Sequence, residues 1–243
     1  IKHQRQIAKK EQITSIEQYK LQPNSMQVGL ISNLKKIIAS GEKRALLISA
    51  TGTGKTYASA FAMRELGFLV HRGQLARQTK KSYEKIFGNT VSMGLVGAGY
   101  HEYDKDYVFA MVQTLNKDSH LMEYRPDEFD CIVLDEAHHT SAGTYQKVMN
   151  YFKPKFWLGM TATPDKRDDN IEGRNIYEIF NYQIAYEIRL QQAMEEDLLC
   201  PFHYFGISDV ALVNEKNIKA RKIDGRDFNI LTGDERVKHI IEQ

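Results

Sequence analysis

The sequence contains few cysteines and no long hydrophobic run, and each absence excludes a class of protein. Only Cys131 and Cys200 are cysteines among 243 residues. Two thiols form no disulfide framework, so a reducing cytoplasm is the expected compartment. No apolar stretch approaches the roughly 20 residues that a membrane span needs, and no secretory signal pattern is present. We therefore expect a cytoplasmic protein without a membrane partner.

Metal-binding clusters and strong net charge are missing as well. Cys200 and His203 lie close together, but two ligands without a second pair do not form a zinc site. The net charge of +2 does not by itself indicate a nucleic-acid binder. A chain that is 42% hydrophobic and 26% charged has instead the composition of a globular protein that can bury a full core.

The most informative motif that is present is rich in glycine. Residues 49–56 read Ser-Ala-Thr-Gly-Thr-Gly-Lys-Thr, after an apolar run at 45–48 and before a segment at 55–66 that has no helix breaker. This is the strand, loop and helix context of a phosphate-binding P-loop. Its glycines permit backbone conformations in which successive N–H groups turn toward phosphate oxygens. The nucleotide-binding residues predicted from this motif are Thr51, Gly52, Thr53, Gly54, Lys55 and Thr56.

Two side chains of the P-loop have separate expected tasks. Lys55 supplies a point charge for the β- and γ-phosphates, and Thr56 supplies a hydroxyl ligand for Mg²⁺. The motif departs from its usual pattern at the first position, where Ser49 replaces glycine. Serine is small and compatible with turns, so we expect this departure to be tolerated.

An acidic pair follows a second buried strand about eighty residues later. The apolar run at 132–134 is typical of a strand in a parallel sheet, so Asp135 and Glu136 should emerge at its carboxyl end, beside the P-loop. There Asp135 can hold Mg²⁺, while Glu136 can orient and deprotonate the attacking water. The sequence therefore predicts ATP hydrolysis, with Lys55, Asp135 and Glu136 as the catalytic residues.

Several further strings carry a family resemblance. Residues 135–138 read Asp-Glu-Ala-His, a DEAH box, and residues 161–163 read Thr-Ala-Thr after an apolar run. Residues 68–72 resemble motif Ia of superfamily two helicases and translocases, and residues 109–115 resemble their next DNA-side motif. The order and spacing of these strings are similar to those of the motor subunits of type I and type III restriction enzymes. The resemblance covers residues 21–207.

The resemblance implies additional roles for residues of this chain. It implies that Gln27 reads the adenine base, and that ATP and Mg²⁺ are the cofactors. It implies coupling between the nucleotide and the DNA through three residues, and contacts with nucleic acid through three more. These are His138, Thr161 and Thr163 for coupling, and Arg72, Gln113 and Thr114 for nucleic acid.

Local charge adds weak support for a nucleic-acid partner. Residues 70–88 contain five basic residues and one acidic residue, and residues 1–20 contain five basic and two acidic residues. Both runs are compatible with nothing more than a solvated helix face. Only the run at 70–88 has a position that favours nucleic-acid binding. Arg72 ends a predicted strand at the edge of the sheet, where phosphates of DNA could be bound without base readout.

Short apolar runs alternate with helical stretches, which predicts an α/β fold. A leading helix carries Gln27 near its start, and right-handed crossovers then build a parallel sheet covered on both faces. The expected fold is a RecA-like P-loop NTPase domain with three α/β/α layers. We predict strands near 44–49, 68–71, 91–95, 107–112, 130–135, 156–160 and 202–207, and helices near 55–66, 73–87, 142–152 and 188–195.

The sequence also predicts the organisation of the chain. We expect a basic lead-in at 1–20, a first RecA-like domain at 21–207, and at 208–243 a linker with the start of a second domain. Relatives of this type have two such domains, and the second supplies arginine fingers, so we expect the chain to be the front half of a motor. Gly67 and Phe68 leave almost no connection between a helix and a strand, which suggests that a turn is missing there.

The predicted function is an ATP-binding domain of a DNA-dependent helicase or translocase. Expected partners are DNA, a second RecA-like domain, and a nuclease or other subunits of a restriction complex. An RNA-remodelling ATPase is the alternative within the enzyme class. A nucleotide-gated binding module that controls a partner nuclease is the alternative outside it, although the intact Glu136 favours hydrolysis.

Overall fold

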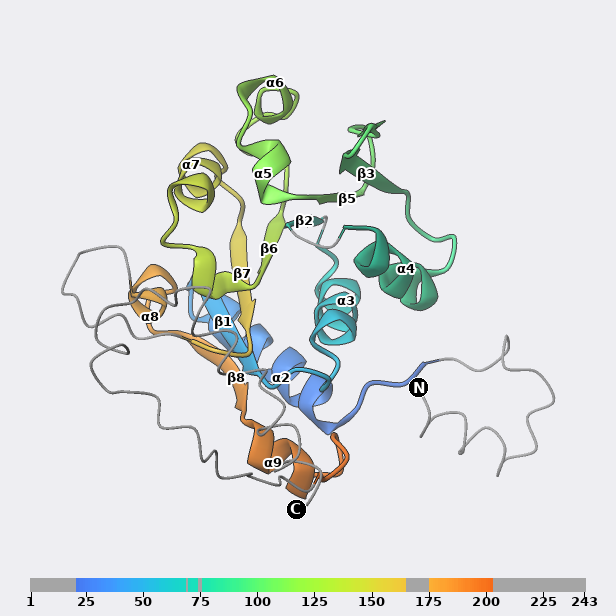
Figure 1. The fold of residues 1–243 in the computed structure, drawn as a ribbon, viewed down its shortest axis with the longest axis vertical. Coiled ribbons are helices and arrows are strands. Elements are labelled where there is room, and N and C mark those ends of the chain that lie inside the picture. Colours follow the sequence, from blue (N-terminus) through green and yellow to red (C-terminus); the bar gives the residue numbers. More distant parts are fainter. Residues whose placement is uncertain (1–20, 69, 74–75, 165–174, 203–243) are drawn as a thin grey trace, which may run out of the picture. The chain divides into compact units, whose positions relative to one another are not determined.

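An eight-stranded sheet runs through the computed structural model, which describes residues 21–68, 70–73, 76–164 and 175–202 (Figure 1). The strands follow the order β4-β3-β5-β2-β6-β7-β1-β8 across the sheet. Their bounds are β1 Arg44–Ser49, β2 Val70–Gly73, β3 Met93–Gly97, β4 Tyr100–His101, β5 Tyr107–Ala110, β6 Cys131–Asp135, β7 Phe156–Thr161 and β8 Ile184–Ile188.

The strands are parallel except for β4, which pairs antiparallel with β3. The carboxyl ends of the seven parallel strands therefore lie along one edge of the sheet, which we call the carboxyl edge. Strand β7 lies between β1 and β6, with Ile48 opposite Thr161 and Asp135 opposite Met160. This order places the ends of the P-loop strand and the acidic-pair strand on either side of Thr161.

Helices cover both faces of the sheet because strand residues alternate between two cores. On β1, Ala45 and Leu47 belong to one core, whereas Leu46 and Ile48 belong to the other. The first core is covered by α2 (Ser25–Ala39), α3 (Lys55–Leu66), α4 (Ala76–Phe87) and α9 (Leu190–Glu195). The second is covered by α5 (Val112–Leu115), α6 (Asp118–Leu121), α7 (Gly143–Tyr151) and α8 (Ile176–Ile179), and the 3₁₀ turn η2 (Ala137–His139) lies beside it. This is the three-layer RecA-like α/β arrangement that the sequence predicts.

Local signals explain where the helices next to the P-loop begin and end. Asn24 accepts a hydrogen bond from the Gln27 amide, and the Gln27 side chain accepts one from the Asn24 amide, which forms a capping box at the start of α2. Gly67 caps the end of α3 in the left-handed conformation, with φ of 66°, and its N–H donates to Met63. The start of α2 is thus fixed beside the nucleotide-binding loop, and the end of α3 is fixed at the end of the helix away from it.

Some predicted boundaries require correction. Strand β2 begins at Val70 rather than 68, so residues 67–69 connect it to α3, and a connection of that length needs no missing turn. Strand β5 ends at Ala110, because the chain turns into α5 after Met111 instead of continuing extended to 112. Strand β3 lies at 93–97, and the helix predicted from 188 begins at Leu190, since Ile188 ends β8.

Strands β4 and β8, helices α5, α6 and α8, and the 3₁₀ turn η2 were not predicted. The strand predicted at 202–207 lies outside the described residues except for Phe202, which is not in a strand. The chain divides into compact units at 1–200 and 201–243, and most of the second unit lies outside the described part. Within the described part, none of the helices combines the length and the apolar character needed to cross a membrane.

Candidate nucleotide-binding site

The P-loop joins β1 to α3 and is built around two left-handed glycines. Gly52 and Gly54 have φ of 92° and 94°, a conformation that is costly for residues with a Cβ atom. Gly54 is also the N-cap of α3, and glycine has no side chain with which to bond the amides of the first turn. Those amides and the positive end of the helix dipole therefore favour an anion at this place.

Ser49 has a structural reason for replacing the usual glycine. It is the last residue of β1, is fully buried, and its hydroxyl is hydrogen-bonded to the hydroxyl of Thr53. Thr53 also donates to the carbonyl of Ala50 at 2.7 Å. The backbone at position 49 is extended rather than left-handed, so a residue with a side chain is tolerated there. The hydrogen bond between Ser49 and Thr53 connects the loop to β1.

The side chain of Lys55 is hydrogen-bonded to the backbone at the start of the P-loop. Its Nζ donates to the carbonyl oxygens of Ser49 at 2.9 Å and Ala50 at 3.3 Å. Burial lowers the pKa of Lys55, and the nearby carboxylates of Asp135 and Glu136 partly oppose this shift. Lys55 and the acidic pair therefore interact electrostatically, from the ends of β1 and β6 on either side of β7.

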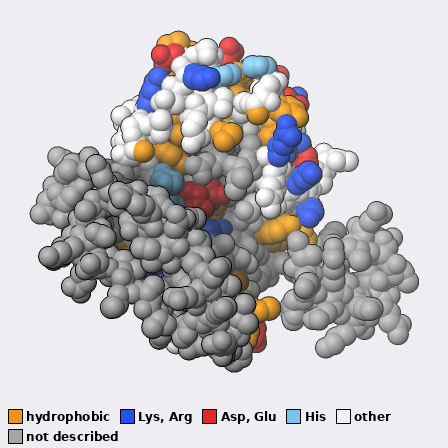
Figure 2. Space-filling view, viewed as in Figure 1, with side chains coloured by type: hydrophobic (Ala, Val, Ile, Leu, Met, Phe, Trp, Pro, Cys, Tyr) orange, Lys and Arg blue, Asp and Glu red, His pale blue; other side chains and the backbone are white. Residues whose placement is uncertain are grey.

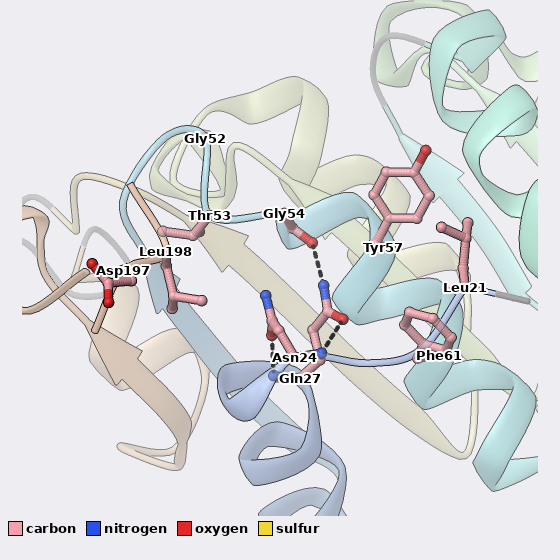
Figure 3. A pocket seen from close by; sticks show the side chains of 10 residues that line it. All are labelled: Leu21, Asn24, Gln27, Gly52, Thr53, Gly54, Tyr57, Phe61, Asp197 and Leu198. Atoms are coloured by element: carbon pink, nitrogen blue, oxygen red, sulfur yellow. Dashed lines mark hydrogen bonds between the residues drawn. The ribbon is translucent and has the colours of Figure 1, made fainter. Parts of the chain in front are cut away.

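A cavity of about 370 Å³ opens beside the P-loop (Figure 3). The side chain of Gln27, which is 5% exposed, contributes a polar edge, and its Nε2 donates to the Gly54 carbonyl at 3.5 Å. Figure 3 shows Leu198 on one side of this edge and Tyr57 on the other. The full lining is Leu21, Asn24, Gln27, Gly52, Thr53, Gly54, Tyr57, Phe61, Asp197 and Leu198.

Gln27 retains the capacity to bind a purine in this cavity. Its Oε1 accepts from the Asn24 amide, and its Nε2 donates one hydrogen to Gly54. A glutamine amide has two acceptor positions and two N–H donors, so one of each is left for a ligand. An acceptor beside a donor matches the N6 and N7 edge of adenine.

The acidic pair lies at the carboxyl end of β6, across β7 from the P-loop. Asp135 accepts a hydrogen bond from the Glu136 amide at 3.2 Å. Glu136 follows in the left-handed conformation, with φ of 51° and ψ of 47°, and its side chain is 43% exposed. Figure 2 shows acidic side chains beside a histidine in a hollow on this face. A carboxylate that a partner orients and water can reach has the character required of a general base.

His138 contacts both the acidic pair and the Thr-Ala-Thr segment. The Nδ1 of His138 lies 3.4 Å from the Glu136 carboxylate and 3.0 Å from the Thr161 hydroxyl. The Thr161 hydroxyl in turn accepts from the Thr163 amide at 3.1 Å. The structure therefore brings the three predicted coupling residues together in one chain of contacts beside Glu136.

The predicted nucleic-acid residues lie farther along the carboxyl edge. The backbone of Arg72 is in β2, opposite Phe109 and Val133. Its side chain is not among those that the structure describes. Gln113 is exposed on α5, and Thr114 packs so closely on β3 that a Cβ added at Gly97 would lie 2.6 Å from its Oγ1. Both follow β5 on a short helix rather than at a strand end.

Sequence reasoning missed several residues of the cavity. Asn24 could have been found, because Asn followed three residues later by Gln is a helix-start signal. Tyr57 and Phe61 lie on α3 at positions that also suit a core. Leu198 had no local signal, and its neighbour Leu199, outside the lining, lies so close to the P-loop that a Cβ at Gly52 would be 2.9 Å from it.

A P-loop, an acidic pair at the neighbouring strand end and a linked Thr-Ala-Thr segment on a three-layer parallel sheet define a helicase-like P-loop NTPase domain. The comparison with protein families specifies this class further. Residues 20–166 match the family described as type III restriction enzyme, res subunit, and the chain belongs to that family.

Curated relatives agree with this assignment. The chain is 27% identical over 230 residues to the type I restriction enzyme EcoAI endonuclease subunit of Escherichia coli, covering 85% of this chain and 28% of that protein. It is 28% identical over 186 residues to "Putative ATP-dependent helicase IRC3" of Saccharomyces cerevisiae, covering 67% of this chain and 26% of that protein. The chain thus spans little more than a quarter of either relative.

Solved structures show the same fold. A nuclease-deletion mutant of the type ISP restriction-modification enzyme LlaGI, in complex with a DNA substrate mimic, matches with a TM-score of 0.56 at 21% identity over 73% of this chain and 21% of that chain. A hypothetical ATP-dependent RNA helicase from Sulfolobus tokodaii matches with a TM-score of 0.53 at 19% identity over 76% of this chain and 56% of that chain.

Proposed function

We propose that this chain is the ATP-binding and ATP-hydrolysing domain of a DNA-dependent motor. The observation that carries the proposal is the position of Lys55 and the acidic pair in one electrostatic site, at the adjacent carboxyl ends of β1, β7 and β6. A binding module without hydrolysis would need the phosphate cradle, but it would not need Glu136 placed beside it.

The residues divide the reaction between them. The amides of residues 51–56 bind the phosphates, and Lys55 leaves the Ser49 and Ala50 carbonyls to neutralise charge on the γ-phosphate. Glu136 accepts a proton from the attacking water. As the new oxygen–phosphorus bond forms, the bond to the β–γ bridging oxygen breaks, and ADP and phosphate are the products.

Mg²⁺ suits the ligands that are present. This ion is usually held by one or two protein oxygens together with substrate phosphates and water, and Thr56 and Asp135 provide a hydroxyl and a carboxylate. When bound, it would neutralise developing phosphate charge. Gln27 would hold adenine by accepting from N6 and donating to N7 while it keeps its bonds to Asn24 and Gly54.

The coupling to DNA is supported by position and by relatives. His138, Thr161 and Thr163 connect Glu136 to the interior of the carboxyl edge, and Gln113 and Thr114 lie farther along the same edge. The similar proteins include restriction enzymes and a putative helicase. We propose that the full-length protein carries a second RecA-like domain that closes the site, and that ATP turnover drives movement on DNA.

Replacing Glu136 with Gln tests the assignment of the base. Turnover by the full-length protein should fall about 10²- to 10⁴-fold, while ATP affinity should stay within about threefold, because Glu136 acts on water rather than on ATP. Lys55→Ala should lower both quantities, since Lys55 contacts the phosphates before and during the reaction. Glu123→Gln, at an exposed site before β6, is the matched control. Turnover of Glu136→Gln within about threefold of wild type would refute the assignment.

The choice of polymer distinguishes the motor from its alternative. ATP turnover should rise on addition of duplex DNA and rise much less on addition of duplex RNA of the same length. Stimulation by RNA alone would replace the DNA motor with an RNA-remodelling ATPase. Absence of stimulation by either polymer, with ATP still bound, would favour a nucleotide-gated module.

A further inference from the structure

An arginine and a tyrosine from different elements stack at the carboxyl edge, outside the nucleotide site. Arg77 lies in the first turn of α4, and Tyr100 begins β4, directly after the turn that follows β3. The Cζ atom of Arg77 is 4.9 Å from the centroid of the Tyr100 ring, and its Nη2 donates to the Tyr100 hydroxyl at 3.1 Å. Both residues are exposed, with Tyr100 at 37%.

The turn that presents Tyr100 is strained. Gly97, Ala98 and Gly99 all have positive φ, of 107°, 52° and 87°, and Gly97 pairs with Tyr100 across the hairpin. Positive φ at both central residues is typical of a tight hairpin turn, but alanine carries a Cβ penalty that glycine or asparagine avoids. Retaining Ala98 in this turn is therefore costly, and observed strain of this kind often marks a functional segment.

Helix stability does not explain why an arginine occupies this position. The first turn of α4 contains no acidic residue, so the positive end of the helix dipole opposes a cation there. Glu84, the one acidic residue of the helix, pairs with Lys80. Arg77 instead continues the exposed face of Lys81 and Lys85 at a spacing of four residues, and Figure 2 shows basic side chains gathered over α4.

The pair is continuous with the predicted nucleic-acid residues. Gly97, at the end of β3, packs against Thr114, and Gln113 is exposed next to it on α5. The hairpin thus connects Arg77 to α5 along the carboxyl edge. Arginine has five N–H donors in a planar fork that fits phosphate oxygens, and the bond to Tyr100 uses one of them.

We propose that Arg77 is a DNA phosphate-binding residue, and that Tyr100 on the strained hairpin is the residue that positions it. The stacked ring restricts the guanidinium to one orientation, so less conformational entropy is lost when a phosphate binds. The contact is independent of base sequence. This inference rests on the proposed function, because it assigns a new contact to the same DNA.

Salt titrations of a fluorescent 20-base-pair DNA duplex bound to the full-length protein test the proposal. Arg77→Gln should reduce the slope of log affinity against log salt concentration by about 0.9, the value for one lost phosphate contact. Arg125→Gln is the matched control, because Arg125 is exposed and precedes β6, at the opposite edge of the sheet. It removes the same charge and should leave the slope within about 0.3 of wild type.

Variants of Tyr100 test whether this residue orients the Arg77 guanidinium or only holds the hairpin against α4. Tyr100→Leu should weaken DNA binding about two- to fivefold without the loss of slope, and Tyr100→Phe, which keeps the ring, should weaken it less. Tyr100→Leu should have no further effect in protein that already carries Arg77→Gln. Thermal unfolding of each variant shows whether the chain remains folded.

The outcomes distinguish this inference from the proposed function. If wild-type protein binds DNA and Arg77→Gln has the same slope as Arg125→Gln, Arg77 contacts no phosphate and only this inference fails. If the Tyr100→Leu loss is undiminished in the double variant, the positioning role fails. If the wild-type protein binds no duplex, the DNA component of the proposed function fails, and the Arg77 site fails with it.

Discussion

The side chain of Gln27 has two tasks that can be separated by mutation. It completes the capping box of α2 with Asn24, and it presents the polar edge of the cavity beside the P-loop. An Ala substitution at either residue breaks the capping box, but only the substitution at Gln27 removes the polar edge. This allows helix stability and base recognition to be measured independently.

We expect Gln27→Ala to reduce the preference of the full-length protein for ATP over GTP, because the acceptor that N6 of adenine would use is gone. Asn24→Ala should destabilise the fold by about 1 kcal/mol through the lost cap and leave the nucleotide preference unchanged. Competition binding with ATP and GTP, together with chemical denaturation, measures both effects. Equal preferences in Gln27→Ala and wild type would remove Gln27 from base recognition.

At the scale of elements, the sequence predicted β1, β6 and β7 well because each contains a short apolar run that is buried on both faces of the sheet. The same reasoning failed where the chain turns at a place that has no glycine or proline. At Met111 the apolar run continues from β5 into α5, so the sequence gives no sign that the strand has ended. It also missed β8, in which only Ala185 and Ile188 are buried, and which follows a turn that places Asn181 and Tyr182 at positive φ. Positive φ suits asparagine, but at Tyr182 it is not the conformation that local residue preference predicts.

The candidate site shows the same division. The P-loop and the DEAH box were predictable because each is a short string whose chemistry depends on neighbouring residues. Leu198 in the cavity could not be predicted, since it comes from a segment about 140 residues after the P-loop and carries only an ordinary apolar side chain. Contacts between distant segments depend on the path of the chain across the sheet.

The packing of β7 against α8 gives a prediction about stability. A Cβ atom at Gly159 would lie 2.4 Å from the ring of Phe180, which is fully buried, so Gly159→Ala should destabilise the protein by about 1 to 3 kcal/mol. Gly143, at the start of α7, has open space around it, and Gly143→Ala should be neutral or slightly stabilising. Urea denaturation of both variants compares them. Equal midpoints would show that Phe180 moves aside without cost.

At the scale of the whole molecule, one wall of the nucleotide cleft is present in the described residues. We expect the 243-residue chain alone to bind ATP and to hydrolyse it slowly, with little response to DNA. An arginine finger from a second domain is worth about 10³- to 10⁵-fold in related phosphoryl transfers. Single-turnover assays of this chain and of the full-length protein measure the difference. Equal rates, with equal stimulation by DNA, would show that this chain is catalytically sufficient.

The left-handed backbone of Glu136 has a consequence for evolution and engineering. A glutamate at φ of 51° costs free energy that glycine would not, so the residue that we propose as the base occupies a position that favours glycine for folding alone. A library selected only for thermal resistance should therefore enrich Glu136→Gly, and the survivors should be inactive. In the proposed motor, the stability threshold and the catalytic requirement would oppose each other at a single residue.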